Sequence, residues 1–66
     1  MKKSSLQYIR ETYNVTAHRG GRIRYTGGRE PKEGTVTRGS GPHIMVRFDG
    51  SLSSVPMHPT WEITYL

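Results

Sequence analysis

The stretch that decides the fold class is "HIMVRFDG", residues 43–50. Ile44, Val46 and Phe48 alternate with residues of the opposite phase, so the three apolar side chains share one face of an extended segment. The Asp-Gly pair that ends the stretch is a turn signal. The stretch is therefore predicted to be a β-strand with one apolar face, followed by a tight turn.

Short segments on both sides repeat this alternation. Before the stretch lie "RIRYT" (22–26) and "GTVTR" (34–38), and after it lie "SLSSVPMH" (51–58) and "WEITYL" (61–66). Turn-forming residues separate these segments, so the sequence predicts five short strands. Pro56 cannot donate a hydrogen bond to a ladder, and the fourth strand is therefore expected at a sheet edge.

Residues 4–14 differ, because their apolar residues recur at the helical spacings of three and four. A serine at the start of this segment can cap a helix, and Asn14 can end it in a left-handed conformation. The segment is predicted to be a short α-helix that covers one open side of the strands. Its apolar face consists of Leu6, Ile9 and Tyr13, and its candidate caps are Ser4 and Ser5.

Five short amphipathic strands hide their apolar faces when the sheet rolls into a small barrel. The predicted fold class is therefore mainly β, with a five-stranded barrel over residues 20–66 after the N-terminal helix, in a single domain over residues 1–66. The expected barrel core consists of Ile23, Tyr25, Val36, Ile44, Val46, Phe48, Val55, Trp61 and Ile63.

The predicted order of elements resembles the SH3-like barrel, in which a single 3₁₀ turn joins the fourth and fifth strands, the place that "HPT" (58–60) takes here. Residues 22–36 are similar to a KOW-type element, in which a first strand leads through a glycine loop into a strand such as "GTV". KOW modules occur in ribosomal and transcription-elongation proteins.

From Tyr8 to Leu66 the chain also resembles short proteins of tailed bacteriophages and prophages. The resemblance rests on "YIRETYNVTAHRGGRIRY", "GTV", "VRFDG" and above all "HPTWEITYL". It implies a phage origin and a barrel, and it implies no established activity.

The composition favours polyanionic partners. Ten Lys and Arg against five Asp and Glu give a formal net charge of +5 and a pI near 10.1, which promotes binding through counterion release. The chain has no cysteine, no apolar run of membrane-spanning length and no signal-peptide pattern. We expect a soluble protein in the cytoplasm of a bacterial host cell, not bound to a membrane, as a monomer or a weak homo-oligomer.

The glycine-rich stretch "RGGRIRYTGGREPKEGTV", residues 19–36, fits no phosphate-binding loop. A Walker loop needs Gly-Lys-Ser/Thr before a helix, whereas this stretch carries two glutamates and leads into a predicted strand. Its glycines are better explained as turns or bulges at barrel corners.

The basic residues of the strands form a candidate nucleic-acid-binding site. Arg22 and Arg24 share the outward face of the first strand, and Arg47 is outward on the third, where such side chains can neutralise phosphates. The alternative is a solvated exterior with Glu30, Glu33 and Glu62 as partial counterions, the first two expected in an exposed loop and Glu62 at an outward strand position. The candidate residues are Arg22, Arg24, Arg29, Lys32, Arg38 and Arg47.

A second candidate surface is a groove bordered by Tyr8, His58 and Trp61. Tyr8 lies beside the apolar stripe of the helix and is the aromatic ring expected to be exposed. Trp61 is in phase with Ile63, which favours its burial, and His58 is expected to hydrogen-bond the turn that it begins.

Metal binding and catalysis have little support in the sequence. His18, His43 and His58 lie far apart, without the spacing of metal ligands, so no metal and no cofactor is expected. The few acids do not combine with a nucleophile and a base, so no enzymatic activity is expected.

The first functional hypothesis is a small phage-encoded, non-enzymatic binding module that docks nucleic acid, RNA or DNA, or a nucleic-acid-associated complex, through a basic barrel face. The alternative is a protein–protein adaptor that binds a host or phage protein through the groove or the N-terminal helix. A third hypothesis is assembly, in which the edge near Pro56 or the C-terminal strand pairs with a second copy.

Overall fold

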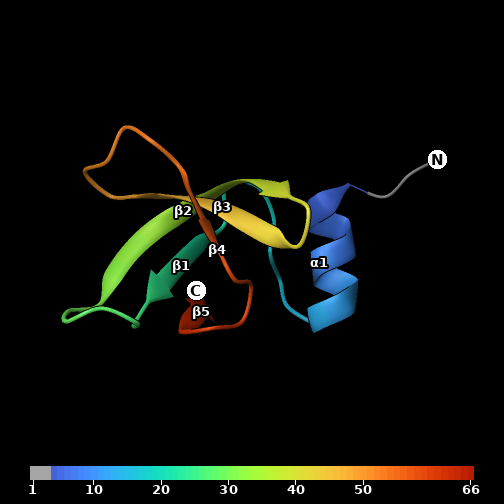
Figure 1. Ribbon diagram of the computed structural model, residues 1–66, viewed down its shortest axis with the longest axis horizontal. Coiled ribbons are helices and arrows are strands. Elements are labelled where there is room, and N and C mark those ends of the chain that lie inside the picture. The colour runs from blue at the N-terminus through green and yellow to red at the C-terminus, as the bar shows by residue number, and fades with distance from the viewer. Residues whose placement is uncertain (1–3) are drawn as a thin grey trace.

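The structure is built on one antiparallel sheet with a helix at its end (Figure 1). The computed structural model describes residues 4–66. Its elements are α1 (Ser5–Tyr13), β1 (Arg22–Tyr25), β2 (Lys32–Ser40), β3 (His43–Phe48), β4 (Val55–Met57) and β5 (Ile63–Tyr65). The strand order is β4-β3-β2-β1-β5. The predicted helix and five strands are confirmed, but the sheet is not closed.

The helix begins and ends where the sequence predicts. Ser4 is the N-cap, and its hydroxyl oxygen accepts a hydrogen bond of 3.1 Å from the backbone N–H of Gln7. Asn14 is the C-cap in the left-handed conformation, with φ at 55°, and its N–H donates to the Arg10 carbonyl. Both ends of α1 thus satisfy backbone groups that a helix terminus leaves unpaired.

The core lies between one face of the sheet, which we call the inner face, and α1. Ile23, Val36, Ile44 and Val46 point to the inner face from the three central strands, and Ile9 meets them from the helix. Tyr25, Phe48 and Ile63 pack against this core while partly exposed, as do the helix residues Leu6 and Tyr13. Most of the predicted core is therefore confirmed.

Two predicted core residues are wrong. Val55 lies opposite Val46, but β4 is an edge strand and leaves the side chain 39% exposed. Trp61 is 61% exposed, because β5 begins only at Ile63 and Glu62 takes a left-handed backbone with φ at 57°. That backbone conformation breaks the alternation which would have placed Trp61 on the same face as Ile63.

A β-bulge in β2 changes the phase of that strand. Val36 pairs with Val46, but the next pair is Arg38 with Met45, so Thr37 is an extra residue on the β2 side. After the bulge Gly39 lies opposite Ile44 and points to the inner face. There it meets the first turn of α1.

The contact at Gly39 fixes how closely the helix approaches the sheet. A Cβ atom at Gly39 would lie 2.6 Å from the Cβ of Ser5 and 2.8 Å from the backbone nitrogen of Leu6. Both distances are shorter than real carbon contacts allow, so a larger residue displaces the helix.

We expect Gly39→Ala to lower the free energy of unfolding by about 1–3 kcal/mol, because the added methyl group forces α1 away from the core. Urea unfolding followed by circular dichroism measures the loss. Gly28→Ala is the matched control, since its Cβ would meet no atom closer than 3.9 Å. Equal stability of the two variants would contradict the close contact.

Candidate nucleic-acid interface

The face of the sheet opposite the core, which we call the outer face, collects arginines from neighbouring strands. Arg22 and Arg24 alternate with the buried Ile23 on β1 and therefore point outward. Arg22 lies opposite Thr35 of β2, and Thr35 lies opposite Arg47 of β3. Arg22 and Arg47 thus occupy one row across three strands.

The bulge brings a fourth arginine to this face. In a regular strand of the same sequence, without the bulge, Arg38 would share the inward phase of Val36. The bulge instead places Arg38 opposite Met45, whose neighbours on both sides along β3 are buried inward. Directly opposed residues of an antiparallel pair share a face, so Arg38 points outward with Arg47.

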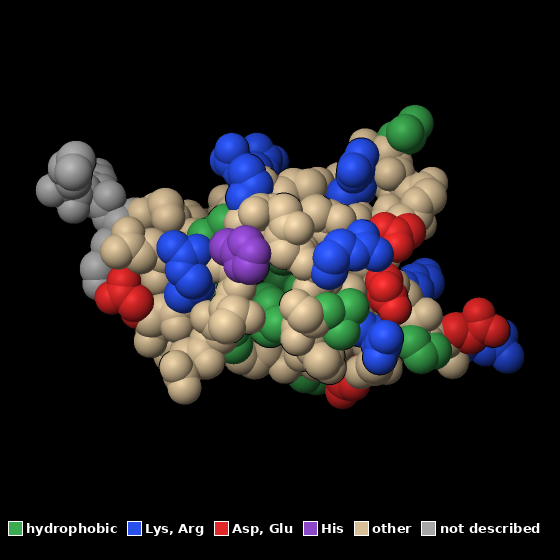
Figure 2. All heavy atoms as spheres, turned by 180° about the vertical axis from the view of Figure 1, so that it is seen from behind, with side chains coloured by type: hydrophobic (Ala, Val, Ile, Leu, Met, Phe, Trp, Pro, Cys, Tyr) green, Lys and Arg blue, Asp and Glu red, His purple; other side chains and the backbone are tan. Residues whose placement is uncertain are grey.

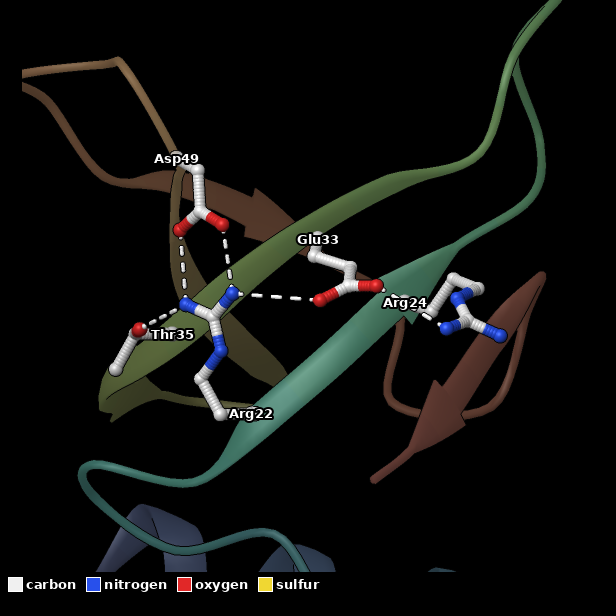
Figure 3. Close-up of polar contacts among 5 residues, drawn as sticks. All are labelled: Arg22, Arg24, Glu33, Thr35 and Asp49. Atoms are coloured by element: carbon white, nitrogen blue, oxygen red, sulfur yellow. Dashed lines mark hydrogen bonds and ion pairs between the residues drawn. The ribbon is translucent and has the colours of Figure 1, made fainter.

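Arg22 is the most heavily bonded side chain of the outer face (Figure 3). Its guanidinium donates two hydrogen bonds to the carboxylate of Asp49, at 2.8 Å and 2.6 Å, and one of 2.9 Å to the hydroxyl of Thr35. This bidentate pair raises the pKa of Arg22 and lowers that of Asp49. The charge of Arg47 lowers the pKa of Asp49 further.

Glu33 is the second carboxylate on this face. It lies opposite Arg24, accepts a hydrogen bond of 3.1 Å from Arg24, and is 3.5 Å from a guanidinium nitrogen of Arg22. The prediction that Glu33 lies in an exposed loop is therefore wrong, because β2 begins at Lys32 and includes Glu33. The two arginines of β1 are balanced locally by two carboxylates, Glu33 and Asp49.

The side chains of Arg38 and Arg47 are different, because within residues 4–66 neither forms a hydrogen bond or a salt bridge. Four arginines and two carboxylates leave the outer face with an excess of two positive charges. That excess lies at the end of the face where Arg38 and Arg47 stand.

The remaining two candidate basic residues lie elsewhere. Arg29 belongs to the loop between β1 and β2, and Lys32 lies opposite Tyr25, whose side chain packs against the core. Both line a shallow, open hollow together with Gly28 and Glu30. In Figure 2 the Lys and Arg side chains are spaced across the visible surface, with Asp and Glu among them, and do not fuse into one patch.

The three candidate groove residues do not line a common cleft among those found in the described chain. Tyr8 is 49% exposed, as expected, and lines an open cleft between the start of α1 and the β2–β3 turn. His58 packs edge-on against Tyr13, with 5.4 Å between the ring centroids. Trp61 is exposed in the segment before β5.

The segment that presents Trp61 is held at several points. Pro59 is buried, and its carbonyl accepts a hydrogen bond of 2.7 Å from the Tyr65 hydroxyl. His58 accepts at Nδ1 from the backbone N–H of Thr60, at 3.1 Å, which confirms the expected role of His58 in its turn. Trp61 is thus exposed on a braced turn.

Residues 4–66 contain no group of three or more His, Asp or Glu side chains that could hold a metal ion. Over the same residues no helix has the length and apolar character needed to cross a membrane.

Asp49 is the site residue that sequence reasoning missed. As predicted, it lies in the turn that follows β3, where its N–H donates to the Glu33 carbonyl and its carboxylate lies beside Arg22. The position of Asp49 beside Arg22 follows from the strand register, which brings together two residues that are 27 positions apart in the chain.

Comparisons of the chain with protein-family models, with curated proteins and with solved structures give no match.

The Arg22–Asp49 pair makes stability depend on acid pH. The pKa of Asp49 is lower in the folded state than its ordinary value of 3.8, so the pair stabilises the fold above that pH and is lost as the pH falls through the folded pKa. We expect Asp49→Asn to be less stable than the wild type at neutral pH, and the difference to shrink in acid.

Urea midpoints at a series of pH values measure this effect. Glu30→Gln, which removes a carboxylate from the β1–β2 loop, is the control and should shift the midpoint little. A difference between wild type and Asp49→Asn that is the same at neutral and acid pH would rule out the pair as its source.

Tyr65→Phe tests the brace behind Trp61. Removing the hydroxyl leaves the Pro59 carbonyl without its partner and is expected to cost about 1 kcal/mol of unfolding free energy. Burial raises the pKa of Tyr65 to about 12. Because this lies above the ordinary value of about 10, the wild type should lose stability as the pH rises from about 10 towards 12.

Urea unfolding gives the stability of both proteins, and an absorbance titration of the tyrosines gives the pKa. If Tyr65→Phe leaves the high-pH titration and the stability unchanged, the hydroxyl does not form this hydrogen bond.

Proposed function

We propose that this protein is a small, non-enzymatic binding module that docks nucleic acid by its phosphates on the outer face. The observation that carries the proposal is that the register and the bulge bring Arg22, Arg24, Arg38 and Arg47 from three adjacent strands to one side of the sheet. Guanidinium groups on a sheet can contact several phosphates at once and need not read bases.

Within this face Arg38 and Arg47 form the centre of the proposed site. Arg22 and Arg24 are already bonded to Asp49 and Glu33, so a phosphate has to compete with a carboxylate for them. Within residues 4–66 Arg38 and Arg47 form no hydrogen bond or salt bridge with a carboxylate, although the charge of Arg47 acts on Asp49, and both residues are exposed. Phosphates are therefore expected to bind first at these two side chains, with release of counterions.

We also propose that the sheet is an open form of the SH3-like barrel and that the chain has a phage origin. The strand order supports the fold assignment, since β1 lies between β5 and β2 and the β2–β3–β4 meander follows. The turn over residues 58–62, which joins β4 to β5, supports it as well. The sequence likeness at "HPTWEITYL" supports the origin.

The exposed Trp61 favours a second candidate function, that of a protein–protein adaptor. Tryptophan is enriched among the residues that dominate binding energy at interfaces, and this one stands on a braced turn. In the adaptor case, a Trp61→Ala variant loses its partner, whereas variants of the outer face keep it.

We expect the double variant Arg38→Ala with Arg47→Ala to bind nucleic acid more weakly than the wild type. Each lost phosphate contact should reduce the slope of log affinity against log salt by about 1, so this variant should lose about 2. Fluorescence anisotropy with labelled oligonucleotides, titrated at several salt concentrations, measures both quantities.

The matched control is Arg29→Ala with Lys32→Ala, which removes the same charge from the β1–β2 loop and the first residue of β2 and should retain most of the affinity. Equal weakening of both double variants would assign binding to net charge and not to the outer face. Absence of salt-dependent binding by the wild type would reject the nucleic-acid function altogether.

A further inference from the structure

The outer face carries no Phe, Tyr or Trp side chain, and its one ring is the imidazole of His43 at the start of β3. The side chains that point outward from the five strands are Arg22, Arg24, Glu33, Thr35, Arg38, Ser40, His43, Met45, Arg47, Pro56 and Thr64. All six aromatic residues of the chain lie elsewhere: Tyr25, Phe48 and Tyr65 pack against the core, Tyr8 and Tyr13 belong to α1, and Trp61 belongs to the turn before β5.

This composition matters for the form of nucleic acid that the face accepts. Proteins that bind single strands gain much of their affinity from bases stacked on aromatic side chains, and those contacts offset the ordering of a flexible strand. Apart from the imidazole of His43, the outer face offers no such platform. It suits a partner whose phosphates are already fixed in space.

The register also sets the spacing of the arginines. Arg22 and Arg47 lie in one row with β2 between them, so their backbones are two strand spacings, about 10 Å, apart. Arg22 and Arg24 are separated by about 7 Å along β1. These spacings let arginines of neighbouring strands contact different phosphates.

On these grounds we propose, on the basis of the function proposed above, that the partner of the outer face is double-stranded DNA, held by its phosphates. A duplex presents one charge for about every 1.7 Å of its axis, and arginines from three strands can neutralise such charges without base contacts. Double-stranded RNA is recognised mostly by its shape and by 2′-hydroxyl and phosphate contacts across a wide minor groove. The guanidinium donors of this face match phosphates and need no 2′-hydroxyl group.

Competition binding tests this proposal. A labelled DNA duplex is displaced by the unlabelled duplex, by either of its single strands, and by an RNA duplex of the same sequence, at two salt concentrations. We expect the DNA duplex to compete about tenfold better than either single strand, because the strands gain no stacking on this face. The variant Arg38→Ala with Arg47→Ala should lose this preference.

Trp61 supplies a second, independent signal, because it is the single tryptophan of the chain and is exposed outside the outer face. Its fluorescence should stay unchanged when the duplex binds, whereas bases stacked on the indole would quench it. Single strands that compete as well as the duplex, quenching of Trp61 by nucleic acid, or a preference for the RNA duplex would each overturn the duplex-DNA proposal.

The two proposals fail in different ways. Salt-dependent binding that depends on Arg38 and Arg47 but prefers single strands leaves the proposed function intact and rejects duplex DNA as the partner. Binding to none of the four competitors at low salt rejects both.

Discussion

The packing of α1 onto the inner face is the constraint on which the rest of the structure depends. The fully buried core consists of Ile9, Ala17, Ile23, Val36, Ile44 and Val46 in the part of the chain that the structure describes, and without the helix the sheet residues among them face water. A chain of 66 residues without cysteine has no disulfide to replace this burial. The close approach at Gly39 is therefore what allows the helix to cover this core.

Because the apolar core lies on the inner face, the side-chain contacts on the outer face of the sheet are mainly between charged groups. Arg22 is fixed by Asp49 and Thr35, and this arrangement ties β1, β2 and the turn after β3 together. The same bonds make Arg22 a poor phosphate ligand. On the outer face the charges of Arg22 and Arg24 are thus balanced by carboxylates, whereas Arg38 and Arg47 carry the excess positive charge.

Local patterns in the sequence were sufficient for the elements of the fold. The alternation of Ile44, Val46 and Phe48 predicted β3, and Ser4 and Asn14 predicted both ends of the helix, because each of these signals acts within a few residues. The exposure of Trp61 was not predictable in this way. It depends on the left-handed backbone of the non-glycine residue Glu62, which alternation cannot reveal.

The site required more than local pattern. The outward direction of Arg22, Arg24 and Arg47 followed from alternation, whereas the bonds from Arg22 to Asp49 and from Arg24 to Glu33 depend on how distant strands pair. Whether the sheet closes is likewise a property of its two edges, β4 and β5, which do not pair here. The spacing of residues along the sequence does not give the distance between these two edge strands.

The bulge at Thr37 affects both the charge of the outer face and the packing of the helix. The same extra residue turns Arg38 to the outer face and Gly39 to the helix. Straightening β2 at its present length would turn Arg38 toward the apolar core and Gly39 away from α1, whereas deleting Thr37 would give a regular strand that keeps both residues on their present faces. Homologues are therefore expected to carry either this bulge or a β2 that is one residue shorter, since both arrangements turn the arginine outward and the glycine toward the helix.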